Sequence, residues 1–210
     1  MKCDSLIFDM DGTLWDAVDS YVTIWNRTLA EVGVNTVPVT RARLMKTMGL
    51  PLESILSELI PDLADKERFL EILDRNEHVM MPELGGRLYD RVHETLQALS
   101  ARMPLFMVSN CGTYGLDNFL DSNDLRKYFK DALSHGQTGL SKADNIRLIV
   151  SRNALKKPFY VGDTESDSRA AHEAGTGMIW AAYGFGKVTD ADYTIHSIGE
   201  LCRLPCVAQL

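Results

Sequence analysis

The sequence predicts an α/β fold in which a mostly parallel sheet is covered by helices on both faces. Short apolar runs of strand length alternate along the chain with stretches of helical pattern, an order that is typical of parallel sheets. A long block of helical pattern separates the first two of these runs and contains no convincing strand. We therefore expect a sheet core that carries one inserted, all-helical unit.

The first expected element is a buried strand over residues 5–8, whose apolar run leads into the polar loop 9–13. A long helix is expected next, because apolar residues then recur at spacings of three and four and share one helix face. These residues are Val18, Val22, Trp25, Leu29 and Val32. Gly33 follows as the expected C-cap.

Residues 40–78 continue the helical pattern. One apolar stripe runs through residues 52–60 and another through residues 69–73. The stretches are expected to be punctuated by prolines, namely Pro38, Pro51, Pro61 and Pro82. The sequence Leu84-Gly85-Gly86 then predicts a turn or hinge.

From about residue 87 onward, helices and strands alternate. The expected helices run through Leu88, Val92, Leu96 and Leu99, from Ser141 to about Asn153, and through Ala170, Ala171 and Ala174 to a stop at Gly175. The expected strands are 104–108, 131–134, 159–161, 178–182 and 193–195.

Composition excludes several classes of protein. Apolar residues make up 45% of the chain and charged residues 24%, as in ordinary globular proteins. No uncharged apolar stretch approaches the ~20 residues of a membrane helix, and the first residues do not resemble a signal peptide. The four cysteines do not form a disulfide framework. We therefore expect a cytoplasmic protein with no membrane partner.

The chain is acidic, so its overall field does not attract anions. Its 22 basic and 29 acidic residues give a formal net charge of −7, and no run of five basic residues occurs. Nucleic acid is therefore not an expected partner. An anionic ligand would need local attraction from a metal ion, a lysine or helix N-terminal N–H groups.

Polar residues follow the ends of several expected strands. In an open parallel sheet these ends meet at one edge, where such folds bind their ligands. The start of the helix at Ser141 opens on the same edge. The residues expected there are Asp9, Asp11, Ser109, Asn110, Lys142, Asp163 and Asp167.

Several carboxylates at one edge repel each other unless a cation joins them. Asp9 and Asp163 offer oxygen ligands that suit Mg²⁺, with water and a substrate phosphate completing its coordination. A carboxylate can also act as a nucleophile and form an aspartyl-phosphate, and Asp11 is placed to protonate a leaving alcohol. Lys142 and the Ser109 hydroxyl can neutralise phosphoryl oxygens. This set of residues predicts phosphoryl transfer.

Four motifs resemble those of the haloacid dehalogenase-like superfamily. Asp9-Met10-Asp11-Gly12-Thr13-Leu14 resembles motif I, Ser109 motif II, Lys142 motif III, and Gly162-Asp163-Thr164 with Asp167 motif IV. The motifs occur in the family's order, and the resemblance covers essentially the whole chain.

The resemblance implies roles for the reacting residues. Asp9 would be the nucleophile and a metal ligand. Asp11 would be the general acid and then the base for the hydrolytic water, and its main-chain carbonyl would also ligate the metal. Lys142 would neutralise the nucleophile and the phosphate.

The resemblance also implies roles for the surrounding residues. Ser109 and Asn110 would bind phosphoryl oxygens, and Thr13 would hold the loop at the phosphate. Asp163 would ligate Mg²⁺, and Asp167 would orient the ligands from just outside the coordination shell.

The resemblance implies a Rossmann-like core of residues 1–14 and 85–210, with residues 15–84 forming a helical C1-type cap. Within the superfamily, the chain resembles the phosphoglycolate phosphatase and β-phosphoglucomutase branch. Residues 49–53, Gly-Leu-Pro-Leu-Glu, resemble the cap loop that lies over the substrate in this branch.

A phosphomutase remains an alternative to a phosphatase. Mutases of this branch carry an arginine in the cap loop that grips a second phosphate, and no basic residue directly follows Gly49. That difference disfavours a mutase, whereas Arg41, Arg43 and Lys46, just before the loop, keep it open.

We therefore expect a Mg²⁺-dependent phosphatase that acts on a small phosphorylated metabolite. Phosphoglycolate, sugar phosphates, nucleotides and pyrophosphate all remain open as substrates, as does the oligomeric state. Dehalogenation is not expected, because dehalogenases lack an acid at the position of Asp11. An inactive binding protein and a receiver-type signalling module are further alternatives, although the helical insert argues against a receiver. Cys111 is expected to be a packed thiol rather than a nucleophile.

Overall fold

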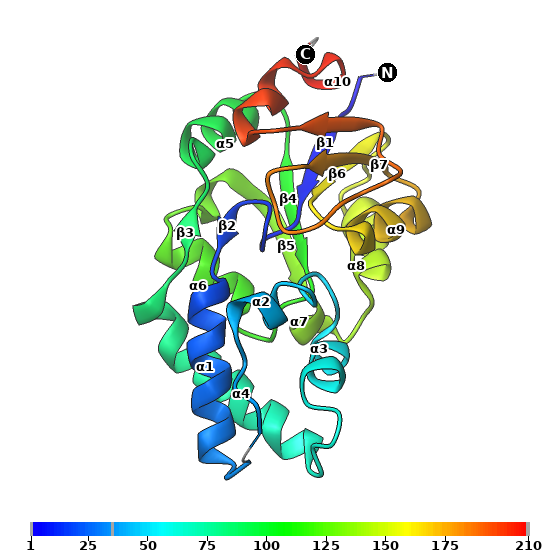
Figure 1. Cartoon of the computed structure of the whole chain (residues 1–210). Coiled ribbons are helices and arrows are strands. Elements are labelled where there is room, and N and C mark those ends of the chain that lie inside the picture. The colour runs from blue at the N-terminus through cyan, green and yellow to red at the C-terminus, as the bar shows by residue number, and fades with distance from the viewer. Residues whose placement is uncertain (1, 35, 209–210) are drawn as a thin grey trace.

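The computed structural model describes residues 2–34 and 36–208, and its centre is a six-stranded sheet (Figure 1). The strand order is β5-β4-β1-β6-β7-β8, and every neighbouring pair is parallel. The strands are β1 (Ser5–Phe8), β4 (Leu105–Ser109), β5 (Phe129–Ser134), β6 (Pro158–Gly162), β7 (Gly177–Ala181) and β8 (Tyr193–Ile195). The predicted α/β fold is confirmed, and each predicted strand is present.

The sheet is buried on both faces. Leu6 and Phe8 of β1 pack into one apolar cluster, whereas Ile7 between them packs into another. Helices α8 (Lys142–Arg152) and α9 (Glu165–Ala174) cover the Ile7 face. Helices α5 (Val92–Ser100) and α6 (Gly115–Ser122) pack in the other cluster. Burial of both faces explains why the strands read as continuous apolar runs rather than alternating ones.

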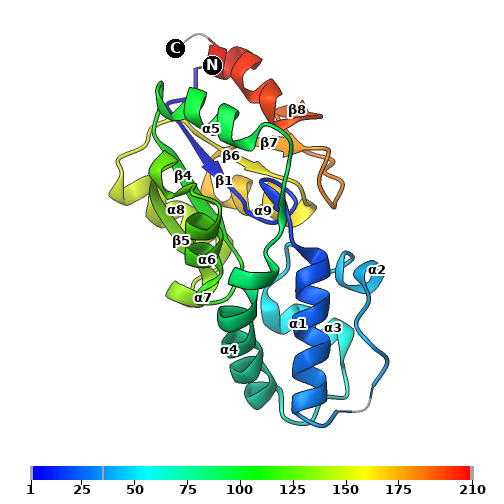
Figure 2. The same ribbon diagram turned by 90° about the vertical axis from the view of Figure 1, so that its left-hand side faces the viewer.

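Four helices lie together at one end of the molecule, away from the short helix α10 (Pro205–Ala208) (Figures 1 and 2). They are α1 (Val18–Glu31), α2 (Arg41–Leu44), α3 (Leu52–Leu59) and α4 (Lys66–Leu84), and we call them the helical region. Helices α1 and α4 pack against each other through the rings of Trp25 and Phe69, whose centroids lie 5.5 Å apart. Asn76 Nδ2 also donates a buried hydrogen bond of 3.0 Å to Thr28 Oγ1.

The chain enters and leaves the helical region through a short antiparallel pair that was not predicted. In this pair, β2 (Trp15–Asp16) lies beside β3 (Arg87–Leu88), with Trp15 opposite Leu88. The prediction that Leu88 is helical is therefore wrong. Its spacing to Val92 fits a helix, but Arg91 has a left-handed φ of 67° and separates the strand from α5.

Pro82 was expected to punctuate the helices, yet it lies inside α4. The helix tolerates this proline in its last turn and continues to Leu84. Gly85 then ends the helix with a φ of 63°, as the predicted turn at residues 84–86 requires. The remaining elements are the short helix α7 (His135–Thr138) and the 3₁₀ turns η1 (Arg126–Tyr128) and η2 (Ile198–Arg203). In the two described ranges, no helix is long and apolar enough to cross a membrane.

Two leucines, one buried on α5 and one exposed on α8, test which side chains belong to the core. Leu96 of α5 is fully buried, whereas Leu148 of α8 is 37% exposed. We expect Leu96→Ala to lower the free energy of unfolding by about 2–5 kcal/mol, because it removes a buried side chain and leaves a cavity. Leu148→Ala should cost less than about 1 kcal/mol. Urea denaturation measures both, and equal losses would contradict the assignment of the core.

Candidate active site

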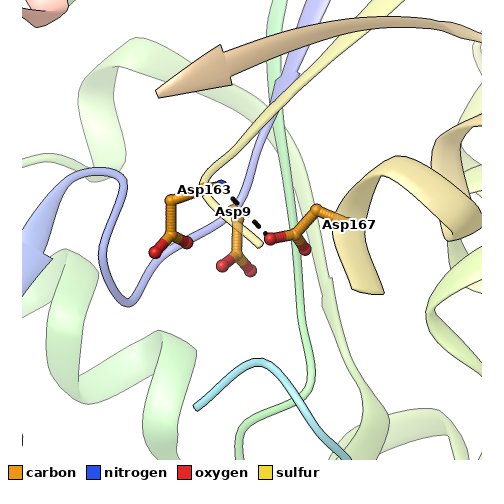
Figure 3. A group of neighbouring side chains, drawn as sticks. All are labelled: Asp9, Asp163 and Asp167. Carbon is orange, nitrogen blue, oxygen red and sulfur yellow. Dashed lines mark hydrogen bonds between the residues drawn. The ribbon is translucent and has the colours of Figure 1, made fainter. Parts of the chain in front are cut away.

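Three carboxylates meet where strands β1 and β6 end (Figure 3). Asp9 directly follows β1, Asp163 directly follows β6, and Asp167 lies in the first turn of α9. One carboxylate oxygen from each lies within 4.8 Å of the other two. All three side chains are buried, so their charges interact strongly.

Lys142 joins two of these carboxylates. Its Nζ donates to Asp9 Oδ1 at 2.9 Å and to Asp167 Oδ1 at 2.6 Å, and its side chain is only 4% exposed. The position of Lys142 follows from the start of α8, where the Ser141 hydroxyl accepts a hydrogen bond from the Asp144 N–H at 3.1 Å. Ser141 thus caps α8 at its start, which places the lysine at the edge of the sheet.

Both carboxylate oxygens of Asp167 are hydrogen-bonded within the protein. Its Oδ1 is paired with Lys142, and its Oδ2 accepts from Thr164 Oγ1 at 2.7 Å and from the main-chain N–H groups of Thr164 and Asp163 at 2.9 and 3.2 Å. Thr164 and Asp167 also form a capping box at the start of α9. This arrangement suits a residue that holds the loop around Asp163 in place.

Asp163 has one free oxygen. Its Oδ2 accepts from the Phe185 N–H at 2.7 Å, whereas its buried Oδ1 has no hydrogen-bond partner in the described part of the chain. Gly12 must be a glycine here, because it has a φ of 80° and an added Cβ would lie 2.2 Å from Asp163 Oδ2. An unpaired buried oxygen close to Asp9 fits a hard divalent cation, whose preferred ligands are carboxylate oxygens.

The electrostatics of these groups also fit a cation. Burial raises the pKa of Asp9 to about 6, although Lys142 opposes this shift. Burial, together with Asp167 and Asp9, raises the pKa of Asp163 well above its usual range. Burial alone would lower the pKa of Lys142, but Asp167 and Asp9 raise it well above its usual value. The site therefore holds more acidic groups than Lys142 can balance, and a bound cation would favour their ionised forms.

Asp11 has different surroundings from Asp9. Its Oδ1 accepts from Trp15 Nε1 at 3.0 Å, and its Oδ2 lies 3.5 Å from the Tyr21 hydroxyl. Burial and the nearby Asp9 raise the pKa of Asp11 to about 8. A carboxyl group that keeps its proton near neutral pH can act as a general acid.

Asp9, Asp11 and Lys142 open into a cavity between the sheet and the helical region, whereas Asp163 and Asp167 do not line it. Asp9, Asp11, Ser109, Asn110 and Lys142 line it from the sheet side. The helical region contributes mainly apolar side chains, including Trp25, Leu44, Met48, Leu52 and Ile55, together with Tyr21 and Glu77. The structure therefore brings most of the predicted site residues to one space.

Thr13 is placed differently from the other predicted residues. It is fully buried and does not line the cavity. Its carbonyl accepts a hydrogen bond of 2.8 Å from the Tyr183 hydroxyl, which holds the loop after β1 against residues 181–186. A phosphate contact of Thr13 stays a prediction from the resemblance.

Cys111 lines the cavity beside Ser109, and its N–H donates to Ser109 Oγ at 3.3 Å. Burial raises the pKa of the Cys111 thiol. A neutral thiol is a poor nucleophile, so this environment agrees with the expected packed thiol.

The basic residues before Gly49 are engaged elsewhere. Arg41 pairs with Asp16 and with Asp19. Arg43 donates to the carbonyls of Val37, Pro38 and Leu59. Lys46 lines a separate surface hollow that includes Arg169 and Lys187. In the described residues, none of the three lines the cavity at Asp9.

The sequence interpretation missed Tyr21 and Glu77. Glu77 lies four residues after the buried Leu73 of α4. An acidic residue on the apolar stripe of this helix is the sequence feature that could have identified it. Phe185 was also missed as the N–H donor to Asp163.

Comparisons with known proteins agree with these motifs. A model of the haloacid dehalogenase-like hydrolase family matches residues 6–181. A phosphoglycolate phosphatase from Aquifex aeolicus is 27% identical over 207 residues, which cover 95% of each chain. Another phosphoglycolate phosphatase, from Vibrio parahaemolyticus, is 25% identical over 224 residues, covering 97% of this chain and 96% of the relative.

Solved structures share the fold. A structure described as a predicted phosphatase from Clostridium acetobutylicum superposes with a TM-score of 0.86 at 21% identity and covers 100% of both chains. A haloacid dehalogenase-like family hydrolase from Streptococcus pneumoniae gives a TM-score of 0.83 at 22% identity, covering 96% of this chain and 97% of its own.

We expect the metal-free protein to lose stability as the pH rises, with a contribution from Asp11. The pKa of Asp11 is about 8 in the fold and about 3.9 in an unfolded chain. The folded state therefore binds this proton more tightly, and the stabilisation is lost between about pH 4 and pH 8.

Urea denaturation in EDTA across this pH range measures the effect. Asp11→Asn cannot titrate and should show a shallower decline than the wild type, whereas Asp62→Asn, at an exposed acid, should not change it. An unchanged decline in Asp11→Asn would contradict the assigned pKa.

Proposed function

The chain belongs to the haloacid dehalogenase-like hydrolases and is a phosphatase, and from this premise we propose that it hydrolyses a small phosphomonoester through an aspartyl-phosphate, with Mg²⁺ as cofactor. The observation that carries the proposal is the buried Asp9, paired with Lys142 and facing a cavity that it shares with Asp11. This set contains a nucleophile, a fixed positive charge and a proton donor, which supports turnover over an inactive binding role.

Asp9 and Asp163 would hold the Mg²⁺ through the free Asp163 Oδ1 and an oxygen of Asp9, together with the Asp11 carbonyl that the family resemblance implies. When bound, the ion supplies positive charge that offsets the developing charge on the phosphoryl oxygens. Asp167 would keep Asp163 in position through the main-chain hydrogen bonds of the loop.

Asp9 would attack the phosphorus with the oxygen that Lys142 does not hold. Lys142 fixes the orientation of the Asp9 carboxylate and places a positive charge beside it, so the attack needs little rearrangement. The Ser109 hydroxyl and the Asn110 main-chain N–H would bind phosphoryl oxygens in the same cavity.

Asp11 would donate its proton to the leaving alcohol as the ester bond breaks. The same carboxylate would then remove a proton from the water that hydrolyses the aspartyl-phosphate. Trp15 and Tyr21 contact the Asp11 side chain, whereas Lys142 binds that of Asp9, which keeps the roles of Asp9 and Asp11 separate.

We further propose that residues 15–84 act as a cap on a core of residues 1–14 and 85–210. Asn110 Nδ2 donates to the Gly49 carbonyl at 3.0 Å, and the Thr113 N–H donates to Asp74 Oδ1 at 3.2 Å. Gly49 has a φ of 84°, and an added Cβ would lie 2.7 Å from Thr164 Oγ1. These close contacts support a lid that excludes bulk water during the reaction and opens for release.

A phosphomutase is less well supported. It would need a cation in the cap to hold a second phosphate, and Arg41 and Arg43 are bonded within the helical region and its linker. The cytoplasmic location and the absence of a nucleic-acid partner stay predictions from the sequence.

Asp9→Asn tests the nucleophile. The amide keeps the size of the side chain but cannot form the phosphoenzyme, so we expect kcat to fall by at least roughly 10³-fold. Phosphate release from p-nitrophenyl phosphate measures the loss, and circular dichroism checks the fold. Asp62→Asn, at an exposed position, should keep full activity. Wild-type turnover in Asp9→Asn would refute the mechanism.

Metal removal tests the cofactor. We expect EDTA to abolish phosphate release and added Mg²⁺ to restore it, because Asp163 then regains a partner for its free oxygen. Activity that survives exhaustive chelation would argue against a metal-dependent reaction.

A further inference from the structure

A carboxylate from the helical region shares the cavity with the reacting residues. Glu77 of α4 lines the space that Asp9 and Asp11 line from the sheet side. No hydrogen bond or ion pair joins Glu77 to another residue in the described ranges. The mechanism proposed above does not use Glu77, which leaves its carboxylate available to a ligand.

The end of the cavity near Glu77 is rich in acidic side chains and has no unpaired base among the described lining residues. Asp74 and Asp11 lie near Glu77, and burial together with these two acids raises the pKa of Glu77 to about 8. Lys142, the one basic residue lining the described cavity, is already paired with Asp9 and Asp167. Acids gathered in this way disfavour a further anion, whereas a cation or a hydrogen-bond donor is favoured there.

The walls around Glu77 suit a short carbon chain. Trp25, Leu44 and Ile55 contribute apolar surface, and the Tyr21 hydroxyl lies near Asp11. The cavity volume is about 60 Å³, so the space beneath the helical region suits a small alcohol part.

We propose that Glu77 selects a short phosphomonoester whose alcohol part is uncharged or cationic and carries a hydrogen-bond donor, a hydroxyl or ammonium group. The inference rests on the proposed phosphatase function and names the substrate class of the same site. Asp9 and Lys142 take the phosphoryl end, and Glu77 accepts a hydrogen bond from the far end of the alcohol.

This selection disfavours phosphoglycolate. Its carboxylate would lie in the part of the cavity that already holds Glu77 and Asp11, with no cation from the helical region to balance it. A buried anion without a partner is costly. The relatives named phosphoglycolate phosphatases are 25% and 27% identical to this chain, a distance that permits a different alcohol.

Three esters of equal length test the inference: phosphoethanolamine, 2-hydroxyethyl phosphate and phosphoglycolate. They differ only in the terminal ammonium, hydroxyl or carboxylate group. We expect kcat/KM with Mg²⁺ to be at least about tenfold lower for phosphoglycolate than for either of the other two, since like charges brought together at a site are unfavourable.

Glu77→Gln isolates the charge of the side chain without changing its size. We expect kcat/KM to fall for phosphoethanolamine and to rise for phosphoglycolate, so that the ratio between them shrinks by about tenfold. Glu77→Asp should keep the wild-type order, because it keeps the carboxylate. Glu71→Gln, an exposed position on the same helix, is the matched control and should leave the ratio unchanged.

The outcomes separate this inference from the proposed function. Phosphoglycolate turned over as well as or better than the other two esters, or a ratio unchanged in Glu77→Gln, overturns the role of Glu77 and leaves the phosphatase in place. Hydrolysis of p-nitrophenyl phosphate without hydrolysis of any of the three esters also overturns the role of Glu77 and leaves the phosphatase in place. No Mg²⁺-dependent hydrolysis of any ester overturns both.

Discussion

The buried ion pairs of Lys142 hold the site together. Asp9 and Asp167 come from segments more than a hundred residues apart in the sequence, and each is almost fully removed from water. Two buried carboxylates without a cation would be strongly unfavourable, so the loop after β1 and the first turn of α9 depend on a lysine from α8. Asp167 also fixes the loop that carries Asp163, because its other oxygen accepts hydrogen bonds from the main-chain N–H groups of that loop.

The cavity changes character from one end to the other. At the sheet edge, Lys142 pairs with two of the acids. Asp163 Oδ1 has no hydrogen-bond partner in the described residues and is free to bind a cation. On the side of the helical region, Glu77 has no hydrogen-bond or ion-pair partner in the described part of the chain, and apolar side chains share the lining. The first end suits a phosphoryl group, and the second suits the alcohol that leaves it. The sheet would therefore determine the reaction, and the helical region would determine which ester reaches it.

Much of the fold and of the site follows from local patterns. Strands such as 5–8 and 104–108 could be predicted because burial on both faces leaves unbroken apolar runs. Asp9, Ser109 and Asp163 could be predicted to converge because parallel strands end at one edge. Lys142 could be predicted at this edge because the helix expected to start at Ser141 opens on it, and the motif resemblance then implied its role.

The remaining features depend on tertiary packing. Two-residue strands such as β2 and β3 are too short to show a period, so Leu88 was read with the helix that follows it. Glu77 lies on the apolar stripe of α4, and its place in the cavity depends on how α4 lies over the sheet. Thr13 matches the family motif, but its loop places it in the interior, where the Tyr183 hydroxyl donates a hydrogen bond to its carbonyl.

The β2–β3 pair has a consequence for how such a protein can diversify. The chain leaves the sheet core at Trp15 and returns at Leu88, and these two residues lie directly opposite each other. The segment between them is therefore inserted into the core at one point, and this segment contains no strand of the six-stranded sheet. A whole helical region of different length or lining could replace this one without shifting the register of any strand. Evolution could thus exchange the substrate-selecting part as a unit while the residues at the sheet edge stay in place.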